Sequence, residues 1–183
     1  MIRILDVVLS AAGLLLGSPF LALLWGLVWW DTRSPLFRQV RLGRNRRPFV
    51  LVKFRTMRLD TGDLPTHLVS AASVTTLGGF MRRTKLDELP QLWNVLCGDM
   101  SLVGPRPGLP SHAALTEARA RAGVFEARPG ITGLAQLKGV DMATPEALAE
   151  VDALMLSELT IARYLRLIVA TVLGGGSGDR ING

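Results

Sequence analysis

The chain has 183 residues, which suits one domain with a hydrophobic core and is too short for two ordinary domains. It carries 21 basic and 15 acidic residues, and only three of the basic residues are lysine. An excess of arginine favours phosphate-bearing partners, because the planar guanidinium group can bind two oxygen atoms at once. The single cysteine, Cys97, excludes an internal disulfide, and the only histidines, His67 and His112, are too far apart in sequence to predict a zinc site.

An uncharged apolar run of 24 residues occupies positions 7–30, VVLSAAGLLLGSPFLALLWGLVWW. This length is sufficient for a helix that crosses a bilayer. A signal peptide would have a shorter apolar region and a cleavage site of small residues, whereas this run ends at Trp29 and Trp30. Because indole rings are common at the headgroup level of a membrane, the pattern favours a membrane helix over a signal peptide.

Ser18 and Pro19 interrupt the middle of this run, and a proline inside a helix removes a hydrogen bond and causes a kink or a break. Two topologies remain open. The helix could span the membrane with a kink, or it could re-enter and return to the face it left, with the Ser18 hydroxyl satisfying one freed backbone group. The positive-inside rule favours a cytoplasmic downstream region in both cases, because nine basic and no acidic residues occur between Thr32 and Leu59.

Two short runs rich in valine and phenylalanine, residues 36–42 and 49–54, flank Gly43-Arg44-Asn45 and predict a β-hairpin. The basic residues of this region fall into two groups. Three are interpreted as a solvated face next to anionic lipid headgroups: Arg44, Arg46 and Arg47. Three others leave the hairpin at a spacing that would let them converge on one anionic ligand: Lys53, Arg55 and Arg58.

The rest of the chain predicts short helices joined by loops. We expect helices at residues 77–83, 90–96, 111–122 and 145–173, a loop at 64–73 and a flexible tail at 174–183. Pro90 at the first helical position and Gly98 at the C-cap delimit the second helix. Ser111 as N-cap and Gly123 just past the end delimit the third.

Three further segments have a distinctive composition. SLVGPRPGLP, residues 101–110, is too rich in proline and glycine for regular structure, and residues 128–139 predict a turn followed by a short extended piece. IARYLRLIVATVL, residues 161–173, is apolar around most of its circumference. This last segment suits a helix at a membrane interface and equally suits an ordinary core helix.

Asp87 and Glu88 are adjacent acids just before Pro90. They could simply mark the start of a helix, where the dipole favours negative charge by about 0.3–1 kcal/mol. Basic residues on both sides argue for a site instead: Arg82, Arg83, Lys85 and Arg106. Two adjacent carboxylates repel each other unless a cation intervenes, and Mg²⁺ prefers one or two carboxylates together with phosphate oxygens. A carboxylate can also attack phosphorus and form an acyl phosphate.

Three motifs carry a resemblance to a known family: KFRTM at residues 53–57, RRTKLDELPQLWNVLCGDMSLVGPRP at 82–107 and RPGITGLAQ at 128–136. In this order they resemble the bacterial sugar transferase family. These are small monotopic phosphoglycosyl transferases that begin glycan assembly on undecaprenyl phosphate, a polyprenyl phosphate. The resemblance covers nearly the whole chain and includes the Ser-Pro break in the apolar run. We expect the minimal form of the family, without a four-span N-terminal extension.

The resemblance implies a fold and a location. The expected fold is mostly α with a small β-hairpin, an α+β arrangement in one unit of 183 residues. Residues 1–32 would form a re-entrant membrane helix broken at Ser18 and Pro19. Residues 33–173 would form a compact cytoplasmic catalytic region with interfacial amphipathic helices, and residues 174–183 the tail. The implied location is the bacterial inner membrane.

The resemblance also implies a reaction. Asp87 matches the aspartate that attacks the β-phosphate of a UDP-sugar, so that UMP leaves and polyprenyl phosphate then attacks the phosphosugar-enzyme. Glu88 matches a residue that helps to hold Mg²⁺, and Asp87 is counted with it as a metal ligand. The substrate-binding candidates, from these motifs and from the spacing described above, are Lys53, Arg55, Arg82, Arg106, Arg128 and Thr132.

The chain departs from the commoner family pattern at one place. Many members have tryptophan after PGITG and then a GRN stretch, whereas this chain has Leu134 and Gly139-Val140-Asp141. This difference bears on the sugar more than on the reaction. We expect an N-acetylated hexosamine, with or without its 6-hydroxyl group.

Two other functions are weighed against this one. A hydrolase that releases the phosphosugar to water would need the same nucleophile and differs only in the acceptor. A membrane-tethered nucleic-acid binder would suit the basic composition, but the basic block lacks interleaved aromatic residues for base stacking, so we expect no nucleic-acid partner. The expected partners are a UDP-sugar, undecaprenyl phosphate and membrane lipids, and a homodimer is compatible with the sequence.

Overall fold

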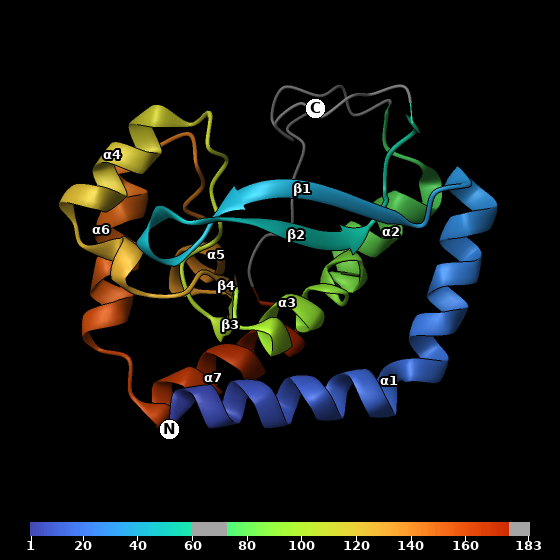
Figure 1. The fold of residues 1–183 in the computed structure, drawn as a ribbon, viewed down its shortest axis with the longest axis horizontal. Helices are drawn as coiled ribbons and strands as arrows, with labels where there is room; N and C mark the ends of the chain where they lie inside the picture. The colour runs from blue at the N-terminus through green and yellow to red at the C-terminus, as the bar shows by residue number, and fades with distance from the viewer. Residues whose placement is uncertain (60–72, 176–183) are drawn as a thin grey trace.

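The computed structural model describes residues 1–59 and 73–175 (Figure 1). This part is mostly helical, as the sequence predicts, and it has two small sheets where the sequence predicts only the hairpin. The α-helices are α1 (Ile2–Thr32), α2 (Thr76–Thr84), α3 (Gln91–Cys97), α4 (Ala113–Arg121), α5 (Leu134–Lys138), α6 (Pro145–Ser157) and α7 (Ile161–Val172). The strands are β1 (Leu36–Leu42), β2 (Pro48–Phe54), β3 (Ser101–Val103) and β4 (Gly130–Thr132). The short 3₁₀ helices are η1 (Arg44–Arg46), η5 (Leu86–Glu88) and η6 (Val124–Glu126).

Helix α1 contains the apolar run and is the one helix in the described ranges that is long and apolar enough to cross a membrane. It bends sharply near its middle, so that its two limbs frame one side of the molecule (Figure 1). Pro19 lies inside the helix and has no N–H to donate to the Leu15 carbonyl four residues earlier. The Ser18 hydroxyl donates to that carbonyl at 2.8 Å, so it is the local partner that the sequence predicts.

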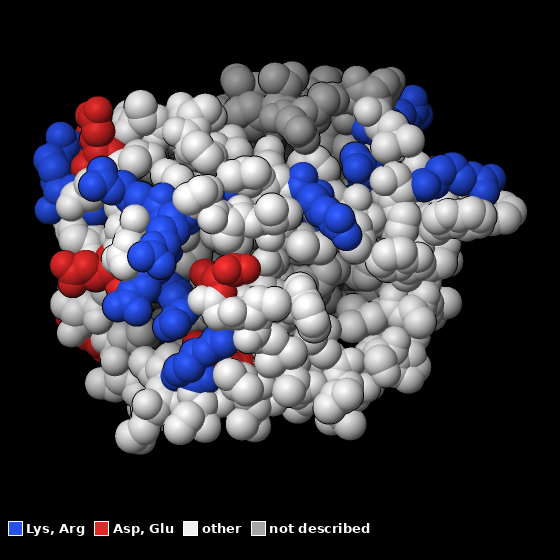
Figure 2. Space-filling model, viewed as in Figure 1, with Lys and Arg blue, Asp and Glu red and all other residues white. Residues whose placement is uncertain are grey.

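The C-terminal limb of α1 packs on the hairpin and on α2. Leu24 and Val28 form a buried cluster with Phe54 of β2 and Met81 of α2. The rest of this limb is largely exposed and apolar, and Figure 2 shows a surface along the helix that is largely free of charged side chains. The limb therefore has one face in the core and one face available to an apolar solvent.

The N-terminal limb of α1 is held by polar contacts that sequence reasoning did not anticipate. Asp6 is 2% exposed, and its Oδ1 accepts hydrogen bonds from the Ser101 hydroxyl at 2.8 Å and the Leu102 N–H at 2.9 Å. The Tyr164 hydroxyl donates to the same oxygen at 2.6 Å. Three donors compensate for burying the carboxylate and tie α1 to β3 and α7.

The predicted hairpin is confirmed. β1 and β2 are antiparallel, with Leu36 opposite Phe54 and Leu42 opposite Pro48. Between them Asn45 and Arg46 adopt left-handed φ values of 56° and 59°, a conformation that asparagine tolerates well in turns. The hairpin lies over α3, where Leu51 of β2, Val95 of α3 and Met100, just before β3, form a buried cluster.

Four expectations about local structure need correction or refinement. Residues 145–173 form two helices, because the Thr160 hydroxyl accepts from the Arg163 N–H and caps a new helix at Ile161. Ser111 is not the N-cap of α4, since His112 occupies that position. Residues 101–110 include a strand, β3, which pairs in parallel with β4. The extended piece expected in 128–139 is β4, and it is followed by α5.

Other expectations about local structure agree with the structure or concern residues outside the described ranges. α2 and α3 fall within one residue of the predicted bounds, and Gly98 ends α3 with a φ of 92°. The predicted loop at 64–73 and tail at 174–183 lie outside the described residues except for Ser73, Gly174 and Gly175. The division of the chain into a membrane helix, a catalytic region and a tail stays a prediction.

Candidate active site

Asp87 and Glu88 occupy η5, between α2 and α3. Lys85 closes α2 in a left-handed conformation with a φ of 58°, and the chain then turns into η5, which packs against β2. Asp87 is 2% exposed and Glu88 is 6% exposed. Adjacent carboxylates buried to this degree are costly unless cations lie close to them.

Arg106 supplies one such cation. Its Nη2 atom lies 2.9 Å from Glu88 Oε1, although 18 residues separate them in sequence. The main chain of Arg106 is also anchored, because Arg119 Nη1 donates to its carbonyl oxygen at 2.7 Å. Arg119 in turn is paired with Asp152 of α6, with its Nε and Nη2 atoms 3.0 Å and 2.7 Å from Oδ2. A buried ion pair therefore fixes the loop that carries Arg106.

The Arg119–Asp152 pair is deeply buried, with the two residues 3% and 1% exposed. Burial raises the pKa of Asp152, while the Arg119 guanidinium beside it acts in the opposite direction. Neither residue was a site candidate from sequence. They lie on α4 and α6, 33 residues apart, and no local pattern links them.

Lys85 is a second cation near the acids that sequence reasoning did not select as a ligand. Burial lowers the pKa of its ammonium group, the Glu88 carboxylate raises it, and Arg106 lowers it. Its Nζ atom donates to the carbonyl of Gly175, just after α7. The segment that follows α7 is thereby brought next to Lys85.

Arg82 lies on α2 and is 7% exposed. Its Nε atom donates to the Thr56 hydroxyl at 2.8 Å, and its Nη1 atom is buried without a hydrogen-bond partner in the described structure. The hydrogen bond between Arg82 and Thr56 depends on close packing of α2 against Thr56, since a Cβ atom at Gly78 would lie 2.1 Å from the Thr56 carbonyl oxygen. A buried cationic N–H with no partner is costly, and an anion would satisfy it.

Lys53 and Arg55 come together on one aromatic ring. Lys53 Nζ lies 5.6 Å and Arg55 Cζ 5.5 Å from the centre of the Phe37 ring. Arg55 is also bound to main-chain carbonyls, those of Ser34 at 3.1 Å and Leu36 at 3.4 Å. Lys53 is buried, whereas Arg58 is exposed beyond the strand. The structure thus pairs the first two candidates and gives Arg55 a structural role at the start of β1.

Arg128 and Thr132 occupy other places. Arg128 Nε donates to the Gly98 carbonyl at 2.8 Å, at the C-terminal end of α3, where a cation is favoured by the helix dipole. The Thr132 hydroxyl, in β4, lies 2.5 Å from that of Thr171 in α7. Helix α3 separates this contact of Arg128 from η5. Its seven residues correspond to about 10 Å of helix.

The donor set at η5 suits a magnesium ion. Among residues 1–59 and 73–175, no group of three or more histidine, cysteine and acidic side chains could hold a metal. Mg²⁺ does not require such a group, because it is commonly held by one or two carboxylates together with waters and substrate phosphates. Asp87 and Glu88 supply two carboxylates, so the residues present fit this ion.

The fold and the site together describe a class of protein. Two buried carboxylates with Arg106 bound to one of them, on a chain whose N-terminal helix is long and apolar enough to cross a membrane, are compatible with an enzyme that acts on phosphate-bearing substrates at a membrane. Comparison with known proteins is more specific. The chain belongs to the bacterial sugar transferase family, whose model matches residues 1–175.

Curated relatives agree with this assignment. The chain is 39% identical over 93% of its length to a UDP-glucose:undecaprenyl-phosphate glucose-1-phosphate transferase of Caulobacter vibrioides, and spans 67% of that protein. It is 37% identical over 94% of its length to a protein of the same name from Klebsiella pneumoniae, and spans 39% of it. It is 35% identical to exopolysaccharide production protein PSS of Rhizobium leguminosarum bv. phaseoli, over 93% of the chain and 92% of that protein. The predicted family and enzyme class are therefore confirmed.

Proposed function

We propose that the chain transfers a sugar 1-phosphate from a UDP-sugar to undecaprenyl phosphate and so begins the assembly of a surface polysaccharide. The observation that carries the proposal is the buried Asp87–Glu88 pair with Arg106 bound to Glu88, in a chain that matches the family model over residues 1–175. Two relatives are named for this reaction, with glucose as the sugar.

The reaction has two steps that both use Asp87. In the first, a carboxylate oxygen of Asp87 attacks the β-phosphorus of the UDP-sugar, the bond to the bridging oxygen breaks, and UMP leaves with that electron pair. In the second, an oxygen of undecaprenyl phosphate attacks the same phosphorus. The aspartyl bond breaks, Asp87 regains its carboxylate, and polyprenyl-diphosphate-sugar is formed.

Glu88 and Asp87 would hold Mg²⁺, which when bound neutralises phosphate charge and lowers the repulsion between anionic nucleophile and anionic substrate. Arg106 orients Glu88 through their 2.9 Å contact. Arg82 would bind a phosphate oxygen through the Nη1 atom that has no partner, and Lys85, which interacts with the Glu88 carboxylate, adds positive charge beside the acids. Lys53 lies on β2, the strand against which η5 packs, and is a further candidate for phosphate binding. Arg128 and Thr132, the other two candidates, contact Gly98 and Thr171 on other elements.

We infer that glucose is the transferred sugar, because the two relatives above whose names specify a sugar both name glucose. The departure at Leu134 does not oppose this inference. Leu134 packs against a core cluster that includes Val103, Met155 and Tyr164, so this position fills the interior. An N-acetylated hexosamine is the alternative donor.

The contacts of α1 favour a re-entrant helix in the inner membrane. Arg3, near its start, donates to the carbonyls of Val95 at 2.6 Å and Leu96 at 3.0 Å, while Val28, near its end, packs against Met81. Both ends of α1 therefore contact the same catalytic region, which a helix that spans the bilayer could not do. The positive-inside rule puts this region in the cytoplasm, with α7 at the interface.

The test is a reconstitution of the purified chain with Mg²⁺ and UDP-glucose, with and without undecaprenyl phosphate. The expected result is a lipid-linked diphosphate glucose and stoichiometric UMP, formed in quantity only with the acceptor. Free glucose 1-phosphate in its absence, at the same rate, would show a hydrolase. UDP-N-acetylglucosamine and UDP-N-acetylgalactosamine serve as competing donors, and preference for either would overturn the inference about glucose.

A further inference from the structure

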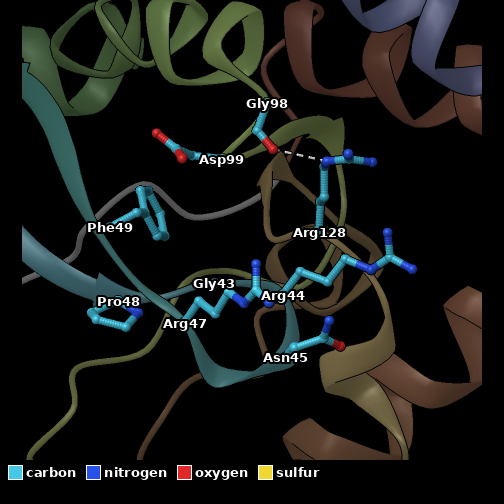
Figure 3. Close-up of a pocket in the computed structure, with 9 residues that line it drawn as sticks. All are labelled: Gly43, Arg44, Asn45, Arg47, Pro48, Phe49, Gly98, Asp99 and Arg128. Atoms are coloured by element: carbon cyan, nitrogen blue, oxygen red, sulfur yellow. Dashed lines mark hydrogen bonds between the residues drawn. The ribbon is translucent and has the colours of Figure 1, made fainter.

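A second concave site lies at the turn of the β1–β2 hairpin. It is a cavity of about 290 Å³ between this turn and the C-terminal end of α3, and Figure 3 shows its lining. We call it the hairpin pocket, and its charged lining residues are Arg44, Arg47, Asp99 and Arg128. The residues of the acidic pair are not part of it. The mechanism proposed above uses neither Arg44 nor Arg47.

The arginines of the hairpin pocket have N–H donors that no residue in the described part of the chain uses. Within the described residues, the side chains of Arg44 and Arg47 have no hydrogen-bond or ion-pair partner. Arg128 is fixed through its Nε atom by the Gly98 carbonyl, which leaves both of its Nη atoms available. In Figure 3 the side chains of Arg44 and Arg47 extend from the turn toward the part of the cavity where Arg128 lies.

The one acid in the lining does not neutralise them. Asp99 Oδ2 accepts from Asn94 Nδ2 at 3.5 Å, and in Figure 3 its carboxylate points away from Arg128. Three guanidinium groups against one carboxylate leave the described lining with a net charge of about +2. A surplus of cations in a concave site attracts an anion.

The backbone holds these arginines in place. The turn is closed by a hydrogen bond of 2.8 Å from the Gly43 N–H to the Arg47 carbonyl, and its two left-handed residues, Asn45 and Arg46, fix its shape. η1 also packs against η6, which anchors the turn to the body of the protein. Arg44 and Arg47 are thus presented by an ordered turn, so less conformational entropy is lost when they bind a ligand.

We propose that the hairpin pocket is a second binding site, separate from Asp87, for a phosphate group. Guanidinium groups bind phosphate through paired N–H donors, and three arginines line this pocket from two segments of the chain. The volume is at the low end of the range for small-molecule sites, which suits a mono- or diphosphate. The group has two potential sources, a phosphorylated solute and the headgroup of an anionic lipid.

The experiment measures binding to the purified full chain in detergent by isothermal titration calorimetry, with EDTA present to weaken phosphate binding at the carboxylates. Inorganic pyrophosphate is the solute probe, and dioctanoyl phosphatidylglycerol is the lipid probe, with dioctanoyl phosphatidylcholine as its zwitterionic control. The variant is R44Q/R47Q. The matched control is R46Q, which changes an exposed arginine of the same turn that does not line the pocket.

We expect R44Q/R47Q to weaken binding of one probe at least tenfold, and R46Q to weaken it less than twofold. An effect on pyrophosphate assigns the pocket to a phosphorylated solute, and an effect on phosphatidylglycerol alone assigns it to a lipid headgroup. R82Q, which alters the catalytic centre, should leave this binding event intact. Equal affinities of the wild type and R44Q/R47Q for both probes would overturn the proposal, whatever the transferase assay shows.

Discussion

Asp87 is the residue on which the two-step reaction depends. Replacement by asparagine keeps the size and removes the anionic nucleophile, so D87N should lower turnover at least about a thousandfold. Intact-protein mass spectrometry after mixing with UDP-glucose alone should show an added phosphoglucose on the wild type and none on D87N. The matched control is E117Q, which changes an exposed glutamate of α4. Near-normal turnover of D87N would contradict the nucleophile assignment.

Arg82 provides a test of phosphate binding, and the thermal stability of the same variant shows whether the substitution harms the fold. R82M removes one hydrogen bond to Thr56, worth about 1 kcal/mol, but also removes a buried N–H that lacks a partner. We therefore expect the thermal midpoint to change by less than about 3 °C, while kcat/KM for the UDP-sugar falls about 10- to 100-fold. R83M, at the exposed neighbouring position, should change neither. A large loss of stability in R82M would indicate a purely structural arginine.

Glu88 and Asp87 provide only oxygen ligands, so the metal should be a hard and exchangeable cation. Activity should vanish in EDTA and return with Mg²⁺, and Mn²⁺ should replace it because it accepts the same ligands. E88Q, which weakens the metal site, should need a higher Mg²⁺ concentration for half-maximal turnover. Full activity of the wild type in excess chelator would rule out the metal.

The sequence grouped the acidic pair and Arg106 as site candidates, because one motif, residues 82–107, carries all three, and the structure brings Arg106 to Glu88. It could not identify Lys85 as a neighbour of Gly175, or Arg119 as the anchor of the Arg106 loop, because these contacts join segments that are distant in sequence. It also associated Leu134 with the choice of sugar. In the structure the partly buried side chain packs against a core cluster of β3, α6 and α7, and its link to the sugar stays a prediction.

At the scale of elements, caps and periodicity predicted the hairpin and the helices α2 and α3, whose signals are local. The misses have two causes. β3 and β4 have three residues each, too few for a period, and they form because the backbones meet closely at Gly104 and Gly130. The break before α7 depends on the Thr160 cap, which interrupts an apolar pattern that continues through it.

The ion pair between Arg119 of α4 and Asp152 of α6 should stabilise both the fold and the site. D152N would leave Arg119 buried without its counter-charge, which costs about 3–5 kcal/mol, or about 10 °C in the thermal midpoint. The Arg106 loop should then shift, so turnover should fall as well. The control is E146Q, which breaks an exposed pair with Arg121 on the same two helices. It should cost less than about 1 kcal/mol. Equal effects of the two changes would refute the anchoring role.

At the scale of the whole molecule, α1 determines how the catalytic region meets the membrane. Arg33, at the end of α1, stacks on Trp29 and Trp30 at 5.0 Å and 5.7 Å, which places a cation and two indoles together where the helix leaves the apolar surface. Basic side chains lie where α1 meets β1 in Figure 2. A straight helix of 31 residues would be about 46 Å long, more than enough to cross the bilayer, so the bend decides the topology.

The re-entrant arrangement predicts that both ends of α1 are on the cytoplasmic side. Two reporters are needed in a chain whose exposed Cys97 is replaced by alanine: a cysteine inserted after Met1, and R38C in β1. In intact cells a membrane-impermeant maleimide should label neither site, and in inverted vesicles it should label both. Labelling of the N-terminal cysteine in intact cells would show a kinked helix that spans the membrane.

Removal of the break in α1 at Ser18 and Pro19 should move the N-terminal cysteine to the outer side of the membrane. S18A/P19A restores the N–H donor to the Leu15 carbonyl and allows α1 to straighten. The inserted N-terminal cysteine should then become accessible from outside, and Arg3 and Asp6 should lose their contacts with α3, β3 and α7. Turnover should fall because these contacts hold the catalytic region against the membrane. G17A is the matched control, since a Cβ atom there meets nothing within 4 Å and leaves the break intact. If S18A/P19A kept both cysteines cytoplasmic with full turnover, Pro19 would not be what turns the chain back.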